Sequence, residues 1–111
     1  MADKTPRMRQ IEAMLADDPD DHELRYFLAM EHAGAGDDAA CVATLREVIA
    51  RSAAKPYIPA FLQAGQALVR LDRPDEACAV LRQGIEAATK AGTPDALHAQ
   101  SEMQGLLAGI E

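Results

Sequence analysis

The chain has 111 residues, of which 49% are hydrophobic and only 4% aromatic, and its formal net charge is −7. This length fits one domain, and the scarcity of aromatic residues favours close-packed helices with a core of Ala, Leu, Ile, Val and Met over a β-sandwich. The acidic balance argues against nucleic acid as a partner, because a duplex-binding surface needs clustered Lys and Arg.

No apolar run approaches the length of a membrane span, and residues 1–10 lack the apolar core of a secretory signal. The two cysteines, Cys41 and Cys78, form neither a close pair nor a metal-binding spacing. We therefore expect no membrane partner and a cytoplasmic location.

Start and stop signals predict six helices joined by short connections. The first predicted helix begins at Pro6 and ends before Pro19, and the others cover about 21–34, 38–53, 58–71, 73–91 and 94–108. The predicted N-caps are Thr5, Asp20 or Asp21, Asp37 or Asp38, Asp72 and Thr93. No segment alternates apolar and polar residues as a strand does. Because short connections make neighbouring helices antiparallel, the predicted fold is all-α with about six antiparallel helices.

Two segments that lie 36 residues apart share one pattern. Residues 36–49, GDDAACVATLREVI, align with residues 72–85, DRPDEACAVLRQGI. The identical pairs are Ala43 and Ala79, Leu45 and Leu81, Arg46 and Arg82, and Ile49 and Ile85. The helices before these segments match more loosely. The second and third helices therefore form one unit, and the fourth and fifth form another.

A helix pair with a period in the mid-thirties resembles the tetratricopeptide repeat, and the chain is similar to a small bacterial-type member of that family. In the second unit the signature positions hold Phe61, Ala64, Gly65, Leu68, Ala77 and Leu81. In the first unit they hold Arg25, Leu28, Ala29, His32, Cys41 and Leu45, so Arg25 and His32 depart from the family's aromatic residues. The resemblance implies an α-α superhelix, a solenoid of stacked helix pairs.

The resemblance also implies one domain over residues 1–111. Its parts are an N-terminal half-repeat helix at 1–19, one repeat at 20–55, a second at 56–92 and a C-terminal capping helix at 93–111. The period of 36 rather than 34 predicts two extra residues, which we place within 54–57. The capping helix has an apolar face at spacings of three and four, made by Ala96, Ala99, Met103, Leu106 and Ile110.

The sequence offers no catalytic residues, no metal site and no cofactor motif. Cys41 and Cys78 lie 37 residues apart, one more than the period, so their side chains point in different directions. We therefore interpret both as structural thiols. None of the three histidines has a second His or Cys three or four residues away. Asp and Glu gather at helix starts, and Arg82 with Glu86 predicts an exposed ion pair. We therefore expect a non-enzymatic protein.

In the resembled family, the first helix of each pair lines a concave groove. Aligned residue by residue, the groove implied here contains Glu23, Tyr26, Phe27, Met30, Leu62, Gln63, Gln66 and Arg70. It lacks the Lys, Asn and Arg set with which some members clamp a peptide's C-terminal carboxylate. Tyr26, Phe27 and Met30 lie outside the single apolar stripe that a helix needs to face its core. They are either covered by the first helix or exposed as an interface.

These residues predict an interaction module that binds a protein partner, as a peptide segment or a helix, through apolar and amide contacts. The alternative is a structural element that self-associates, because the two full repeats are fewer than such stacks usually need. A homo-oligomer is therefore a possible partner arrangement.

Overall fold

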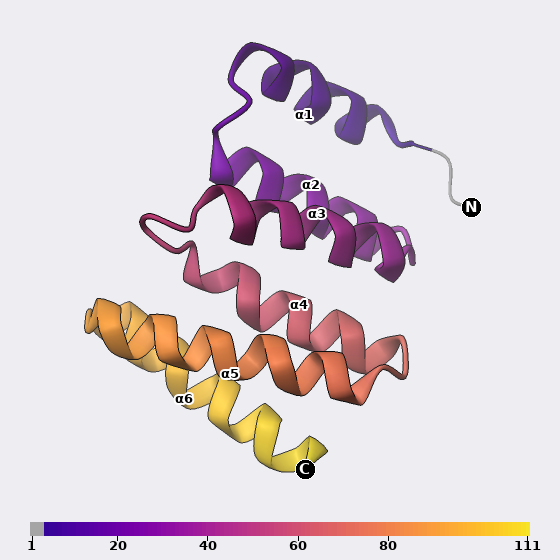
Figure 1. The fold of residues 1–111 in the computed structure, drawn as a ribbon. Helices are drawn as coiled ribbons and strands as arrows, with labels where there is room; N and C mark the ends of the chain where they lie inside the picture. The colour runs from indigo at the N-terminus through magenta and orange to yellow at the C-terminus, as the bar shows by residue number, and fades with distance from the viewer. Residues whose placement is uncertain (1–3) are drawn as a thin grey trace.

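The protein is described here by a computed structural model of residues 4–111, in which six helices follow one another in sequence order from top to bottom of Figure 1. The helices are α1 (Pro6–Asp17), α2 (His22–Gly34), α3 (Asp38–Arg51), α4 (Ile58–Arg70), α5 (Pro74–Ala91) and α6 (Pro94–Ile110). No strand occurs among these residues, so the predicted all-α fold is confirmed. The ends predicted at 53, 71 and 108 differ from those of α3, α4 and α6 by one or two residues.

Short polar side chains begin four of the helices, as predicted. The side chains of Thr5, Asp21, Asp37 and Thr93 each accept a hydrogen bond from the backbone N–H three residues further on, at 3.0–3.2 Å. These bonds satisfy donors that a helix start otherwise leaves free. The caps therefore fix the starts of α1, α2, α3 and α6.

The predicted cap at Asp72 is wrong. The N-cap of α5 is Arg73, which makes no side-chain capping bond, whereas Asp72 has a left-handed backbone with φ 57°. Asp72 and Arg73 instead donate their N–H groups back to Val69 O at 3.0 Å and Leu68 O at 2.9 Å. This is the Schellman arrangement that closes a helix, and Asp tolerates the left-handed position better than most residues. Asp72 therefore ends α4 rather than beginning α5.

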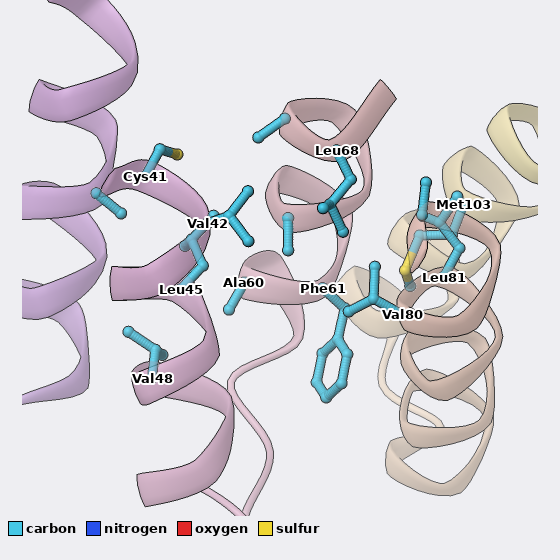
Figure 2. Packing of buried hydrophobic residues seen from close by; sticks show 14 of the residues in the cluster. Cys41, Val42, Leu45, Val48, Ala60, Phe61, Leu68, Val80, Leu81 and Met103 are labelled. Carbon is cyan, nitrogen blue, oxygen red and sulfur yellow. The ribbon is translucent and has the colours of Figure 1, made fainter. Parts of the chain in front are cut away.

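The pair formed by α4 and α5 approaches closely because two of its facing positions are glycine. Figure 2 shows Phe61 and Leu81, the large side chains that lie opposite them. A Cβ on Gly65 would lie 2.5 Å from Leu81 Cδ2, and a Cβ on Gly84 would lie 2.5 Å from Phe61 Cβ. Leu81 is fully buried and Phe61 is 6% exposed. Each large side chain thus fills the space left by a glycine on the opposite helix.

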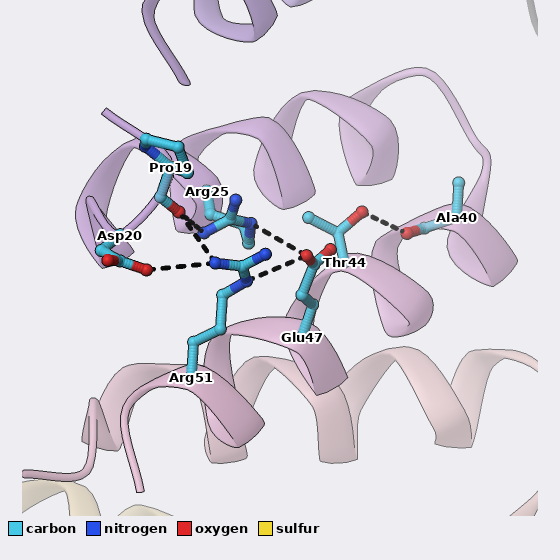
Figure 3. A network of polar contacts seen from close by, with 7 residues as sticks. All are labelled: Pro19, Asp20, Arg25, Ala40, Thr44, Glu47 and Arg51. Carbon is cyan, nitrogen blue, oxygen red and sulfur yellow. Dashed lines mark hydrogen bonds and ion pairs between the residues drawn. The ribbon is translucent and has the colours of Figure 1, made fainter. Parts of the chain in front are cut away.

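The pair formed by α2 and α3 uses a charged side chain at the place of Phe61 (Figure 3). Arg25 is buried and donates from Nη1 to Pro19 O at 2.7 Å, and its Nε lies 3.7 Å from Glu47. Arg51 bonds the same carbonyl and pairs with Asp20 and Glu47, both at 3.1 Å. These contacts fasten the α1–α2 connection to α3. Arg25 was expected only as a departure from the aromatic pattern, and the structure gives it this role.

The connection between α3 and α4 contains residues 54–57, where the extra residues are expected. It covers 52–57, two residues more than the α1–α2 connection at 18–21. Ser52 anchors it, because its buried hydroxyl accepts a hydrogen bond from Tyr57 N at 3.2 Å.

The last helix covers the flank of α4 and α5. Ala96 and Met103 are buried, and Ala99, Leu106 and Ile110 pack half-buried against the core, so the predicted apolar face of α6 is present. The predicted pair of Arg82 with Glu86 is wrong. Because α6 brings the C-terminal residue over α5, Arg82 pairs with Glu111, and Glu86 pairs with Lys90 at 3.1 Å.

Candidate functional site

Three of the four aromatic side chains of the chain form one cluster on α2 and the start of α4. The ring centroids of Tyr26 and Tyr57 lie 5.3 Å apart, and those of Tyr26 and Phe27 lie 6.3 Å apart. Phe27 is 44% exposed, while Tyr26 and Tyr57 are half-buried. We call these three residues the aromatic cluster. Partly exposed aromatic side chains combine a large apolar area with a polar end, which suits contact with another protein.

Polar groups border the aromatic cluster on both helices. Burial raises the pKa of Tyr26, and a hydrogen bond with the Gln63 side chain opposes that rise. Burial likewise raises the pKa of Tyr57, with a smaller contribution from the Glu23 carboxylate. The structure therefore brings Glu23, Tyr26 and Gln63 together, and it adds Tyr57, which sequence reasoning had missed. The one signal that could have indicated Tyr57 is the rarity of aromatic residues in this chain, which makes each of them a candidate contact residue.

The other predicted residues of α2 and α4 differ in how accessible their side chains are to a ligand. Met30 and Leu62 pack half-buried against the core, and Gln66 is half-buried. Arg70 is exposed, but its guanidinium pairs with the Asp38 carboxylate of α3 at 2.9 Å. A ligand that used Arg70 would have to compete with this ion pair.

Phe27 also faces α1, across a shallow cleft of about 570 Å³. We call this the α1 cleft; its lining residues are Arg7, Gln10, Ile11, Ala13, Met14, Leu24 and Phe27. Arg7 pairs with Glu31 at 2.7 Å across the same junction. The first helix thus leaves Phe27 largely exposed, whereas Tyr26 and Met30 pack against the main core.

A larger cleft of about 1010 Å³ lies where the α3–α4 connection meets α5 and α6. Its lining is mostly apolar and includes Ile58, Pro59, Phe61 and Ala99. Tyr57 lines this cleft and also contacts Tyr26, so it links the cleft with the aromatic cluster. No pattern in the sequence indicates this cleft, because its walls come from three separate parts of the chain.

The thiol of Cys41 is poorly suited to chemistry. Cys41 is fully buried, and burial raises its pKa to about 11, although the nearby Arg70 charge opposes the rise. At neutral pH it is a neutral, apolar filler on the small-residue site of α3, as the sequence predicts. Cys78 is half-buried, and both cysteines are free. Within residues 4–111 no three His, Cys, Asp or Glu side chains are grouped closely enough to hold a metal ion.

A family model described as tetratricopeptide repeat matches residues 1–68, more than half of the chain. The chain belongs to the tetratricopeptide repeat family. The match covers α1 to α3 and most of α4, including the pair in which Arg25 replaces the aromatic residue. Tetratricopeptide repeat domains are generally protein-interaction modules without catalytic activity.

Two solved structures are similar over most of their length, and both are of a tetratricopeptide repeat domain protein from Salinibacter ruber. The solution structure has a TM-score of 0.72 and 31% identity, and the match covers 84% of this chain and 89% of that one. The crystal structure has a TM-score of 0.71 and 30% identity, with 81% and 96% covered. No curated protein matches the sequence. In the described part of this tetratricopeptide repeat chain, no helix is both long and apolar enough to cross a membrane.

Proposed function

We propose that the protein is a non-enzymatic interaction module that binds a peptide segment or a helix of another protein along the surface shared by α2 and α4. The observation that carries this proposal is the aromatic cluster, which gathers three of the chain's four aromatic rings at a partly exposed place. In an otherwise aliphatic protein, such grouping is typical of a contact site rather than of core packing alone.

The neighbouring groups supply specificity. Gln63 and Gln66 are half-buried amides that can bond the backbone of an extended peptide, as Gln and Asn do in contact surfaces. The large cleft beside Tyr57 extends the apolar surface toward α6 and gives room for a bulky side chain of the partner. The exposed Glu23 carboxylate next to Tyr57 favours a partner with a basic residue at that end.

We further propose a cytoplasmic location and a scaffolding role. Two free cysteines are compatible with a reducing compartment.

The test selects peptides from a random library on the wild-type protein and measures their dissociation constants. The double variant Tyr26→Ala/Gln66→Ala should bind selected peptides at least about tenfold more weakly, since it removes a ring and an amide from the contact, a loss of about 1.4 kcal/mol. Gln104→Ala removes an exposed amide from α6, away from both clefts, and is the matched control, which should bind as the wild type does.

Thermal unfolding separates binding from folding. Tyr26 is half-buried, so the double variant should keep its fold with a modestly lower melting temperature. Equal binding by the wild type and the double variant would overturn the proposed groove. A collapse of the melting temperature would show that Tyr26 serves the core instead.

Self-association is the second candidate function. The exposed apolar α1 cleft favours it, because such a cleft is a surface on which a helix could pack.

A further inference from the structure

Among residues 4–111, three of the four exposed large apolar residues lie at the two ends of the helix stack. In this described range the four residues are Met14, exposed at 53%, Leu97 at 45%, Phe27 at 44% and, on α4 away from both ends, Val69 at 41%. Met14 and Phe27 line the α1 cleft at one end. Leu97 lies on α6 at the other end. Both ends therefore present apolar side chains to solvent, which is costly unless something covers them.

The repeat identifies what fits the α1 cleft. Helices α2, α4 and α6 start 36 residues apart, as do α3 and α5. The buried residues Met8 and Ile11 of α1 correspond to Val42 and Leu45 of α3, at an offset of 34. With these offsets, Ile11 occupies the place of Leu81, and Met14 occupies the place of Gly84. In α5, these two positions are the ones that contact the first helix of the pair.

The same offsets show which face of α6 is complementary. Leu97 corresponds to Phe61, and Ser101 corresponds to Gly65. Phe61 and Gly65 are the residues of α4 that meet Gly84 and Leu81. Leu97 and Ser101 are both exposed, so this face of α6 is available.

We propose that the α1 cleft receives α6 of a second copy of this chain, so that α6 of one molecule and α1 of the next form a helix pair like α4 and α5. In this pair Leu97 packs on Met14 and the small Ser101 lies over Ile11. Met14 is well suited to such a contact, because its flexible side chain adapts to the shape opposite it. The proposal specifies the self-association candidate and does not depend on peptide binding by the aromatic cluster.

Charge supports the antiparallel arrangement that the other pairs have. Residues 4–12, at the start of α1, carry Lys4, Arg7 and Arg9 against Glu12, a net charge of 3 − 1 = +2. The second half of α6, residues 102–111, carries Glu102 and Glu111 and no Lys or Arg, a net charge of −2. These segments meet in the proposed pair, while the positive end of the α6 dipole comes near Asp17 and Asp18. Asp95, near the start of α6, is the one acidic residue of that helix end that would lie near Asp17 and Asp18.

The contact is expected to be weak and open-ended. A single helix–helix surface lies at the small end of specific interfaces, about 1,000 Å² or less in total. The contact joins two different surfaces, the α1 cleft of one copy and α6 of the next. Each added copy therefore leaves one of each surface free, and association continues into longer assemblies instead of stopping at a dimer.

Sedimentation velocity of the 111-residue chain from micromolar to millimolar concentration tests the proposal. The average mass of the wild type should rise continuously with concentration. Met14→Glu and Leu97→Glu each block one end, so each variant alone should remain monomeric. A mixture of the two retains one intact end on each partner and should level off at the mass of a dimer. Val69→Glu changes an equally exposed apolar residue away from both ends, and it should behave as the wild type does.

Ser101→Arg, at an exposed position of the same α6 face, repeats the block with a different side chain. Circular dichroism of each variant should match the wild type, because all the substituted side chains are exposed. A wild-type chain that stays monomeric throughout, or a mixture of the two Glu variants that stays monomeric, overturns the proposal. A monomeric wild type would leave the cleft to a helix of another protein.

Discussion

Single glycines set the distance between α4 and α5. Gly84→Ala should lower the free energy of unfolding by about 1–3 kcal/mol, the usual range for overpacking. The new Cβ would lie 2.5 Å from Phe61 Cβ and 2.6 Å from Met103 Sδ. Met103 can move aside, but Phe61 Cβ is fixed to the backbone of α4, so the helices must separate.

Gly105→Ala is the matched control for urea unfolding. Gly105 lies inside α6, and a Cβ there meets nothing within 4 Å. Because alanine is the better helix former, this change should raise the free energy of unfolding by up to about 1 kcal/mol. Equal effects from the two substitutions would contradict the close approach at Gly84.

The burial of Cys41 predicts a pH dependence of stability. Its pKa is about 11 when folded and near 9.0 when exposed, so the folded state holds the thiol proton more tightly. The contribution to stability is therefore complete below pH 9 and is lost as pH rises from 9 to 11. Cys41→Ser should reduce this loss in urea unfolding measured across that range. It should also lower stability at pH 7 by about 1–3 kcal/mol, since it buries a hydroxyl in an apolar site. An unchanged pH profile in Cys41→Ser would contradict this assignment.

At the scale of the helix pair, the same two facing positions hold different residues in the two repeats. Phe61 faces Gly84 in the second pair, and the corresponding residues of the first pair are Arg25 and Val48. Arg25→Phe should be destabilising by about 1–3 kcal/mol, because Val48 leaves less room than Gly84 does and the bond to Pro19 is lost. Adding Val48→Gly should recover part of that loss.

A double-mutant cycle by urea unfolding measures this coupling. Val48→Gly alone should also be destabilising, because Val48 is fully buried and glycine weakens a helix. The two losses should then sum to more than the loss of the double variant. Strictly additive losses would show that the two positions do not share one space.

The sequence predicted the helices well because their signals are local. Thr5, Asp21, Asp37 and Thr93 cap helices through bonds to residues three positions away, which a linear reading detects. Asp72 was misjudged because the same residue type suits a helix start and a left-handed helix end. Whether Asp72 begins α5 or ends α4 depends on the residue at which α4 stops.

The candidate site was less predictable, because it depends on how distant segments meet. The repeat placed Tyr26 and Gln63 on first helices, but it gave no reason to expect Tyr57 beside them. Likewise, the partner of Arg70 is Asp38, 32 residues away, and no periodic pattern indicates which charged residues will pair. The role of Arg25 was hidden because its acceptor is a backbone carbonyl, which every residue has.

At the scale of the whole molecule, the order of the helices in space is their order in the chain (Figure 1). Each helix contacts mainly its sequence neighbours; across residues 4–111, only α4 and α6 share a substantial contact without being consecutive. The search for the native contacts therefore closes only short loops, which favours fast folding. Cooperativity is correspondingly local, and the stack can lose an end while its middle remains folded. Helix α1, held by Met8, Ile11 and Leu15 and mainly by contact with α2, is the part whose amide protons should exchange with solvent first.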